Sequence, residues 1–370
     1  MKYKEMKLGD VAEINMGQSP NSKYFNSDGK GIEFLQGIRT FGENYPSFDT
    51  YTTQYNKISK KGDILFSVRA PVGKVNWSDR KIAIGRGLAA LNVLPNFSSK
   101  YVYYFLKKVG SQINSISSGT VFSSINKKEL ANVKILIPDS LKDQEYIGTR
   151  LALLDKKIEL NNQINDNLLK LAQTIFQEIL KISSLHALTI SDVGTVVGGG
   201  TPSKRVVKYW NGDIPWLSPK DLSNHLKVFT SHGENNITQE GLDNSSTKLL
   251  PQNTILFSSR APIGYLSIAN NQIATNQGFK SVIPNKGYPF WFIYELLKSE
   301  TPKIINEANG STFKEISGGR LKQHAIDIPS SADVLEYNSV FLPLFDKIRQ
   351  SENEIDSLNQ IKTALLNRLF

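Results

Sequence analysis

Lysine and arginine are the residues of this sequence with the clearest chemistry. The chain has 44 of them against 34 aspartates and glutamates, which gives a formal net charge of +10. The excess is uneven, with net charges of +9 over residues 1–141, 0 over 142–181, +3 over 182–331 and −2 over 332–370. Two basic blocks separated by a neutral segment are typical of a protein that binds a polyanion. The other interpretation is that the charge only keeps the chain in solution.

No familiar catalytic motif accompanies these cations. The sequence has no cysteine, and its four histidines, at positions 186, 225, 232 and 324, lack the spacing of metal ligands. Gly198–Gly200 continues as Thr-Pro and not as a phosphate-binding loop, and neither Gly-x-Ser-x-Gly nor an Asn/Asp-Pro-Pro-Tyr/Phe motif occurs. We therefore predict no catalytic residue, no metal and no cofactor in this chain.

The composition also predicts a cellular location. No run approaches 18 apolar residues, and the N-terminus carries charges where a signal peptide would be apolar. The absence of cysteine is typical of a reducing compartment. We expect a cytoplasmic protein with no membrane span.

The chain contains an internal duplication. Residues 64–73, ILFSVRAPVG, recur as residues 255–264, ILFSSRAPIG, at a shift of 191. The same shift relates residues 119–122 to 310–313 and 137–138 to 328–329, and a shift of 182 relates 8–11 to 190–193. A single shift held over some 75 residues predicts two copies of one fold that differ by loop insertions.

Each copy begins with a globular block and continues as a long helix. The blocks contain short apolar runs between turn residues, such as 64–66, 89–94 and 133–137, and one predicted helix each, over 100–109 and 291–298. Beyond each block, apolar residues alternate at steps of four and three, from Ile147 to Ile179 and from Phe341 to Leu369. We place the N-caps of these two helices at Asp143 and Asp333.

The repeat of 3.5 residues predicts a coiled coil between the two long helices. Asn161 and Asn165, central in the first stripe, would fix its register and orientation. The other interpretation is that each helix packs only on its own block. The predicted fold is α+β: two duplicated globular blocks, each followed by a long helix, with the helices paired as an antiparallel coiled coil under pseudo-two-fold symmetry. The predicted boundaries are 1–141, 142–183, 184–331 and 332–370.

An ordered set of short motifs resembles one known family. Residues 199–203, GGTPS, are followed by 209–218, YWNGDIPWLS, and by Lys220-Asp221, with weaker counterparts at 17–20, 24–25 and 31–35. Together with the repeated Ser-x-Arg-Ala-Pro-x-Gly, Gly-Thr/Ser-x-Phe and Ile-Pro, this order is similar to the specificity (S) subunits of type I restriction–modification systems. Gln144 follows the family pattern, and its counterpart Leu335 departs from it.

The resemblance implies a non-catalytic subunit that reads double-stranded DNA. Each block would be a target recognition domain that reads one half of a split, asymmetric target, and the helices would set the spacer. The helices would also dock two modification (methyltransferase) subunits, which use S-adenosylmethionine, and restriction (translocase/endonuclease) subunits that use ATP and Mg²⁺ would join them. A helix of about 35 residues spans roughly 50 Å, and half-sites one turn of DNA apart lie about 34–36 Å apart.

DNA-binding residues are expected among Lys, Arg, Asn and Gln on loops. Arg69 and Arg260 recur in the duplicated motif, which favours a shared role such as a phosphate contact; an equally good interpretation is an arginine bonded to nearby carbonyls. Trp210 and Trp216, with Phe25 and Phe34 in the first block, are expected in the core. The predicted DNA contacts are Lys23, Lys30, Gln36, Arg39, Arg69, Lys74 and Arg86 in the first block and Lys204, Arg205, Lys208, Lys220, Arg260, Asn276, Gln277 and Lys280 in the second.

Three other functions fit parts of this pattern. One is a specificity subunit that serves a methyltransferase without a restriction partner. The second is a nuclease or methyltransferase with a fused reader, for which the duplicated blocks and helices leave no room. The third is a coiled-coil adaptor, which would not explain why the basic charge gathers in the blocks.

Overall fold

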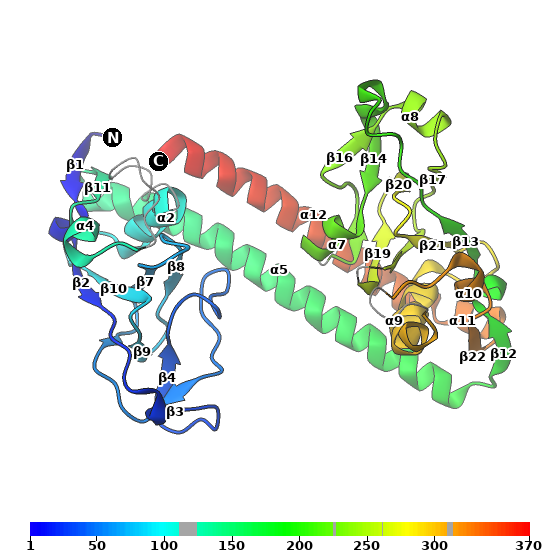
Figure 1. Cartoon of the computed structure of the whole chain (residues 1–370), viewed down its shortest axis with the longest axis horizontal. Coiled ribbons are helices and arrows are strands. Elements are labelled where there is room, and N and C mark those ends of the chain that lie inside the picture. The colour runs from blue at the N-terminus through cyan, green and yellow to red at the C-terminus, as the bar shows by residue number, and fades with distance from the viewer. Residues whose placement is uncertain (111–123, 225–226, 261, 309–313) are drawn as a thin grey trace. The chain divides into compact units, whose positions relative to one another are not determined.

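The computed structural model describes residues 1–110, 124–224, 227–260, 262–308 and 314–370. The repeated Gly-Thr/Ser-x-Phe motif and Ala261 lie outside these residues. The first block contains β1 (Tyr3–Lys7), α1 (Leu8–Val11), β2 (Ala12–Met16), η1 (Ser22–Tyr24), β3 (Phe25–Asn26), β4 (Ile32–Leu35), β5 (Tyr51–Thr52), β6 (Ile58–Ser59), β7 (Ile64–Ser67), β8 (Val75–Trp77), β9 (Ile82–Ile84), β10 (Leu88–Val93), α2 (Ser99–Val109), α4 (Lys127–Ala131) and β11 (Lys134–Pro138) (Figure 1).

The second block follows a similar order with additional elements, and some of its elements are longer. It contains β12 (His186–Thr189), α6 (Ile190–Val193), β13 (Thr195–Gly198), η3 (Val207–Tyr209), β14 (Trp210–Leu217), α7 (Pro219–Asn224), β15 (Phe229–Thr230), β16 (Asn235–Ile237), α8 (Gln239–Asp243), β17 (Leu249–Leu250), β18 (Ile255–Ser259), β19 (Ile263–Ala269), β20 (Ile273–Thr275), β21 (Lys280–Ile283), α9 (Phe290–Glu307), α10 (Gly318–Lys322) and β22 (Ala325–Ile328). The predicted strands and helices of both blocks are confirmed, although α9 is longer than expected.

Sheet topology confirms the duplication. The first block has a sheet in the order β2-β10-β7-β8, and the second has its counterpart β13-β21-β18-β19, extended by β15. A smaller sheet follows in each, β3-β5-β4-β9-β6 and β16-β14-β20-β17, in which β4 and β14 run parallel to β9 and β20. The antiparallel pairs β1-β11 and β12-β22, each formed by the first and last strands of a block, complete the two blocks. The prediction of two α+β copies is therefore correct.

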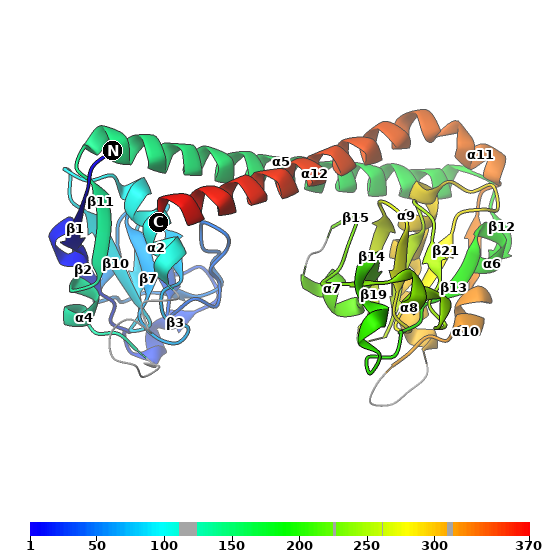
Figure 2. The same cartoon turned by 90° about the horizontal axis from the view of Figure 1, so that it is seen from above.

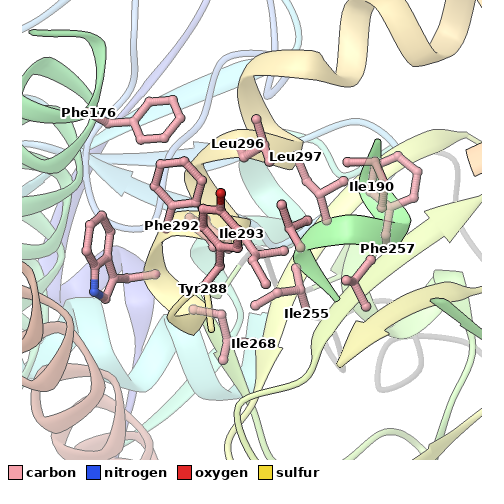
Figure 3. Packing of buried hydrophobic residues seen from close by; sticks show 14 of the residues in the cluster. Phe176, Ile190, Ile255, Phe257, Ile268, Tyr288, Phe292, Ile293, Leu296 and Leu297 are labelled. Carbon is pink, nitrogen blue, oxygen red and sulfur yellow. The ribbon is translucent and has the colours of Figure 1, made fainter. Parts of the chain in front are cut away.

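One helix of each block separates the larger sheet from the long helices. In the second block α9 packs on β18 and β19 and lies beneath α5 (Leu141–Ile182), as Figure 2 shows. Phe176 of α5 meets Phe292 of α9, with ring centroids 5.4 Å apart, and Figure 3 shows the two rings turned toward each other above Ile255 and Ile268. In the first block Tyr104 of α2 donates to Asp155 of α5 at 2.8 Å.

The long helices bury the predicted stripes. Ile147, Leu151 and Ile158 of α5 are buried, as are Phe341 and Ile348 of α12 (Asn338–Leu369). The chain divides by contacts into a first unit, residues 1–158 with 357–370, and a second unit, residues 159–356. Both helices contribute to both units, so each unit contains a stretch of helix pair.

Helix pairing is antiparallel within each unit. In the first unit Asp155 contacts Lys362, while the earlier residues Ile147 and Leu151 share a cluster with the later Leu369. In the second unit Asn161 donates to Glu354 at 2.8 Å, while residues 172–179 of α5 share a cluster with 341–348 of α12. The coiled coil is thus confirmed, and Asn161 is one of its buried polar contacts, as predicted. The two-fold relation of the blocks and the four domain boundaries stay predictions.

The predicted helix caps are wrong. The first turn of α5 begins at Leu141, so Asp143 lies inside the helix. The second helix is preceded by a separate turn, α11 (Ser331–Glu336), whose N-cap is Ser330: its hydroxyl accepts from the Asp333 amide and donates to the Asp333 carboxylate. A carboxylate at the third helical position also stabilises the start of a helix, which explains why sequence alone confuses the two places.

Gln144 closes the junction between the first block and α5. Its side chain, 1% exposed, donates to the carbonyl of Pro138 at 2.8 Å and accepts from the amide of Ser98 at 2.9 Å. In the second block the residue matching Ser98 is Pro289, which has no amide hydrogen. The hydroxyl of Tyr288 donates to the carbonyl of Pro329 at 2.9 Å. The second block therefore has no amide at position 289 to satisfy, and the carbonyl of Pro329 already has a donor. No glutamine is needed there, and Leu335, which stands in place of Gln144, is exposed.

Two absences apply to the described residues. Among them, no helix is long and apolar enough to span a bilayer. Nor does any group of three or more His, Asp or Glu side chains in those ranges form a metal site.

Candidate nucleic-acid interface

The duplicated motif forms the same turn in both blocks. The Ser67 hydroxyl donates to the carbonyl of Pro71 at 2.8 Å and accepts the amide of Lys74 at 2.8 Å. Ser258 makes the same two bonds, to Pro262 at 2.8 Å and from Tyr265 at 2.7 Å. The closing glycines, Gly73 and Gly264, have φ of 91° and 101°, a conformation that other residues adopt only with strain. The bonds of the serine therefore fix the turn that carries the arginine of the motif, Arg69 or Arg260.

A second loop packs beside this turn. In the first block the Gly85 amide donates to Leu35 at 2.8 Å, and the Val68 amide donates to Gly87 at 2.9 Å. The equivalent bonds of the second block run from Asn276 to Leu217 at 2.8 Å and from Ser259 to Gly278 at 2.7 Å. The residue in the middle of each loop, Arg86 or Gln277, is thus held between the ends of two strands.

The third loop of each interface follows β2 or β13. A Cβ on Gly17 would lie 2.2 Å from the carbonyl oxygen of Gly85, and one on Gly199 would lie 2.0 Å from that of Asn276, so only glycine allows this approach. The Ser19 hydroxyl accepts the amide of Arg86 at 3.2 Å. The three loops therefore meet at one end of each block.

Three of the predicted DNA contacts converge in the first block. They line a pocket of about 230 Å³ formed by Gln36, Gly37, Ile38, Ser67, Arg69, Ala70, Arg86 and Gly87. Arg69 and Arg86 are exposed, and no carboxylate of the described residues lies within ion-pair distance of either guanidinium. Two uncompensated arginines and an amide in one concave site are groups that bind phosphate oxygens and base edges.

The second interface carries less free charge. Arg260 lies 3.5 Å from the carboxylate of Glu315, where the first block has Ser124. Lys280 donates to the carbonyl of Gln277 at 3.1 Å. Burial lowers the pKa of Lys280; nearby Glu315 opposes this effect and Arg260 adds to it. The Gln277 side-chain oxygen accepts the hydroxyl of Thr201.

Four other predicted cations are engaged by acids. Arg39 makes a two-bond pair with Asp49, at 2.6 and 2.7 Å, which raises the pKa of Arg39. Lys30 lies 3.8 Å from Asp28, Lys220 lies 3.3 Å from Glu234, and Lys208 pairs with Glu240. Such exposed pairs are weak and salt-sensitive, but they lower the charge available to a polyanion. Lys30 and Arg39 do not line the first-block pocket.

The remaining predicted residues are dispersed. Lys74, Lys204 and Arg205 are exposed, and Lys23 lies 5.0 Å from the centre of the Tyr24 ring. Asn276 accepts the amide of Gly278 at 2.8 Å, a bond that shapes the loop. Ser19, Thr201 and Glu315 also belong to the loops but were not predicted as interface residues. The shift of 182 relates Ser19 to Thr201, and the shift of 191 relates Ser124 to Glu315, so the repeat was the signal that could have located them.

Of the four aromatic residues predicted to lie in the core, Phe34 and Trp216 are buried, whereas Phe25 and Trp210 are half-buried. Phe25 and Phe34 stack with ring centroids 4.6 Å apart, and Trp210 meets Trp216 edge to face at 5.1 Å. Trp216 is buried and its indole donates to the carbonyl of Gly200 at 3.0 Å. These rings support the glycine loops from beneath.

Known proteins resemble this chain over its whole length. The family model of the type I restriction modification DNA specificity domain matches residues 1–170 and again 186–362. A type I restriction enzyme specificity subunit (MjaIX) of Methanocaldococcus jannaschii is 39% identical over 183 residues, which cover 49% of this chain and 42% of that protein. A second, putative one of that organism (MjaX) is 36% identical over 48% of this chain and 45% of its own length. The chain thus spans less than half of the length of these two relatives.

A longer match and one solved structure agree with this similarity. The HindI specificity subunit of Haemophilus influenzae is 23% identical and covers 100% of this chain and 98% of its own. The crystal structure of a type I restriction–modification S subunit from M. genitalium has the same fold, with a TM-score of 0.70, 18% identity and coverage of 100% of this chain and 96% of that one. Because the family model matches residues 1–170 and 186–362, which is most of the chain, the chain belongs to the type I restriction–modification DNA specificity family.

Proposed function

We propose that this chain is the non-catalytic DNA-reading subunit of a cytoplasmic type I restriction–modification complex. Each block binds one half of a split, asymmetric target through its three glycine-bounded loops. The observation that carries the proposal is the pocket in which Gln36, Arg69 and Arg86 meet with no opposing carboxylate among the described residues. Equivalent loops in the second block present Gln277, Lys280 and Arg260. Neither set contains the paired acid, base or metal ligands that hydrolysis or methyl transfer requires.

The helices in this proposal set the unread spacer between half-sites and dock two modification subunits. Those subunits supply S-adenosylmethionine chemistry, and restriction subunits supply ATP- and Mg²⁺-dependent cleavage. Support comes from large apolar side chains on α5 that are 38–63% exposed, at steps of seven, seven, four and seven: Tyr146, Leu153, Leu160, Ile164 and Leu171. These steps keep one face of a helix, and an exposed apolar face of this length is typical of a protein-binding surface.

The proposal is tested by co-expressing the chain with a cognate modification subunit and sequencing methylated adenines in the host DNA. We expect a split, asymmetric motif that disappears when this chain is deleted. Methylation that persists without the chain contradicts the reading role. Failure of any complex to form favours the coiled-coil adaptor.

The docking face is tested with Leu160→Glu and Leu171→Glu together. Charges on the apolar face should abolish co-purification of the modification subunit while helix content and DNA binding are kept. Asn162→Glu, an exposed change outside this set, is the matched control. Unchanged co-purification in the double variant places docking elsewhere.

A further inference from the structure

Two residues occupy the same place in the two blocks and differ in chemistry. Arg86 and Gln277 are related by the shift of 191, and each is the central residue of a loop with matching backbone bonds on both sides. The flanking glycines match as well: a Cβ on Gly87 would lie 2.4 Å from the carbonyl oxygen of Gln36, and one on Gly278 would lie 2.9 Å from the ring of Pro219, which matches Gly37. The backbone bonds at both ends of the loop therefore match, and the central side chain differs.

At the neighbouring arginine position the two blocks have the same residue type. Arg69 and Arg260 each pair their backbone with an equivalent residue, Ser124 or Glu315. Two blocks that read different sequences share their phosphate contacts, because phosphates carry no sequence information, and differ where they meet bases. By this criterion, position 69 or 260 serves the backbone of DNA, and position 86 or 277 serves a base.

The two side chains fit different bases. An arginine binds both acceptors of guanine in the major groove, whereas a glutamine amide pairs with the donor and acceptor of adenine. Arg86 is exposed at the pocket it shares with Gln36 and has no carboxylate partner among the described residues. The Gln277 oxygen accepts Thr201, which orients the amide and leaves its second lone pair and both N–H groups available.

We propose that Arg86 and Gln277 are equivalent base-reading positions, so that the first half-site has a guanine where the second half-site has an adenine. This inference rests on the proposed function, and it adds the chemistry that distinguishes the two half-sites.

The test exchanges the two side chains in the full complex. Arg86→Gln, Gln277→Arg and wild type are each co-expressed with the modification subunit, and the methylated motifs are sequenced. Arg80→Gln, which changes an exposed arginine of the same block that lies outside the pocket and is not among the predicted DNA contacts, is the matched control. We expect Arg86→Gln to change one base pair of one half-site, with the preference for guanine over adenine reduced at least about tenfold. Gln277→Arg should change one base pair of the other half-site, and the control should change neither.

Three outcomes overturn the inference. An unchanged motif in both variants means that these positions do not read bases, while a wild-type motif that depends on this chain leaves the proposed function intact. Changes at many base pairs mean that the substitution has disturbed the fold of the block, and they also count against a single base-reading position. Loss of methylation is resolved by selecting bound sequences from a random DNA pool with the purified complex. Retained binding with one relaxed position supports the inference, and equal loss of affinity for all sequences identifies Arg86 as a phosphate contact.

Discussion

The two blocks have matching hydrogen bonds in their loops, but different side chains satisfy the backbone at their junctions with the long helices. The hydrogen bonds of Ser67 and Ser258 recur, and so does the close approach of Gly17 or Gly199 to a backbone carbonyl. The junction with the long helix does not: Gln144 satisfies two backbone groups in the first block, whereas Pro289 and Tyr288 remove or satisfy them in the second. The difference shows that the two copies keep the hydrogen bonds that shape the loops. The side chains at the junction with the long helix have diverged.

The helix pairs of the two units also differ in the charged residue at one equivalent position. A shift of 194 relates the helices, since Phe370 packs on Tyr101 at 5.2 Å as Phe176 packs on Phe292 at 5.4 Å. By this shift Asp155 of the first unit matches Arg349 of the second. Asp155 is 6% exposed and pairs with Lys362 at 2.5 Å, while Arg349 lies against the Phe229 ring at 4.4 Å and donates to Asn253 at 3.0 Å.

Among the variants that test this comparison, Asp155→Asn is expected to cause the largest loss of stability, in the first unit. Lys362, which is nearly buried, would keep only the exposed Glu43, 3.3 Å away, as a counter-charge. Removing one partner of a buried pair costs about 3–5 kcal/mol. Denaturant unfolding combined with hydrogen exchange of α2 measures the free energy of unfolding of the first unit.

Two further variants control this prediction. Asp155→Leu with Lys362→Met should recover most of the loss, because replacing both charges removes the uncompensated ion. Arg349→Met in the second unit should cost less, since Arg349 is 22% exposed and its ion-pair partner Asp346 is 57% exposed. Equal losses for Asp155→Asn and the double variant would contradict the ion-pair explanation.

The second unit should be the one whose stability falls as pH rises. Burial raises the pKa of Glu295 to about 7, with Lys298 only partly opposing it. Burial likewise raises the pKa of Glu352 to about 7, although the amides of Phe229 and Val228 oppose it. A folded-state pKa above the unfolded value means that the folded unit binds more protons. Stability is then greatest below about 4.5 and declines until about pH 7, by on the order of 3 kcal/mol for each group.

Glu295→Gln sharpens the pH prediction. The neutral side chain cannot ionise, so the pH dependence of unfolding of the second unit should become shallower. The first block has Tyr104 in place of Glu295, and it should lack this dependence. Thermal unfolding between pH 5 and 8 with hydrogen exchange of α9 makes the measurement, and an unaltered slope in Glu295→Gln would remove Glu295 as the cause.

Gln144→Leu should destabilise the first unit by about 2–4 kcal/mol. The substitution leaves the Ser98 amide and the Pro138 carbonyl without their buried partner, and each such group costs about 1–3 kcal/mol. The reverse change, Leu335→Gln, is exposed and should stay within about 0.5 kcal/mol. Unfolding of both variants in urea decides the matter; similar losses in the two would mean that the junctions are built alike.

The smallest expected effects concern DNA affinity. Lys204→Ala should weaken binding and reduce the slope of affinity against salt by about one ion, because its charge has no acidic partner within the described ranges. Arg39→Ala should have a smaller effect, since Asp49 already holds its guanidinium. Titration of labelled target DNA at several salt concentrations compares them, and a larger loss for Arg39 would mean that the pair opens on binding.

The sequence predicted what depends on repetition and periodicity. The shift of 191 located both serine-centred turns, and the heptad stripe located the helix pair with Asn161 inside it. It did not predict that Asp155 is buried, because a charged residue outside the stripe is buried only when a distant lysine, here Lys362, meets it. Nor did it distinguish Arg86, which lines the pocket without a carboxylate partner among the described residues, from Arg39, which is paired with Asp49. The pairing of Arg39 with Asp49 depends on a loop conformation that residue types do not encode.

The division of both long helices between the units has a consequence for synthesis on the ribosome. The first unit includes residues 357–370, where Phe370 packs against Tyr101 and Phe105. All of residues 159–356 must therefore be translated before this unit can complete its core. The block that is translated first therefore lacks part of its core until the whole second block has been translated, because Tyr101 and Phe105 of α2 have no Phe370 to pack against before then.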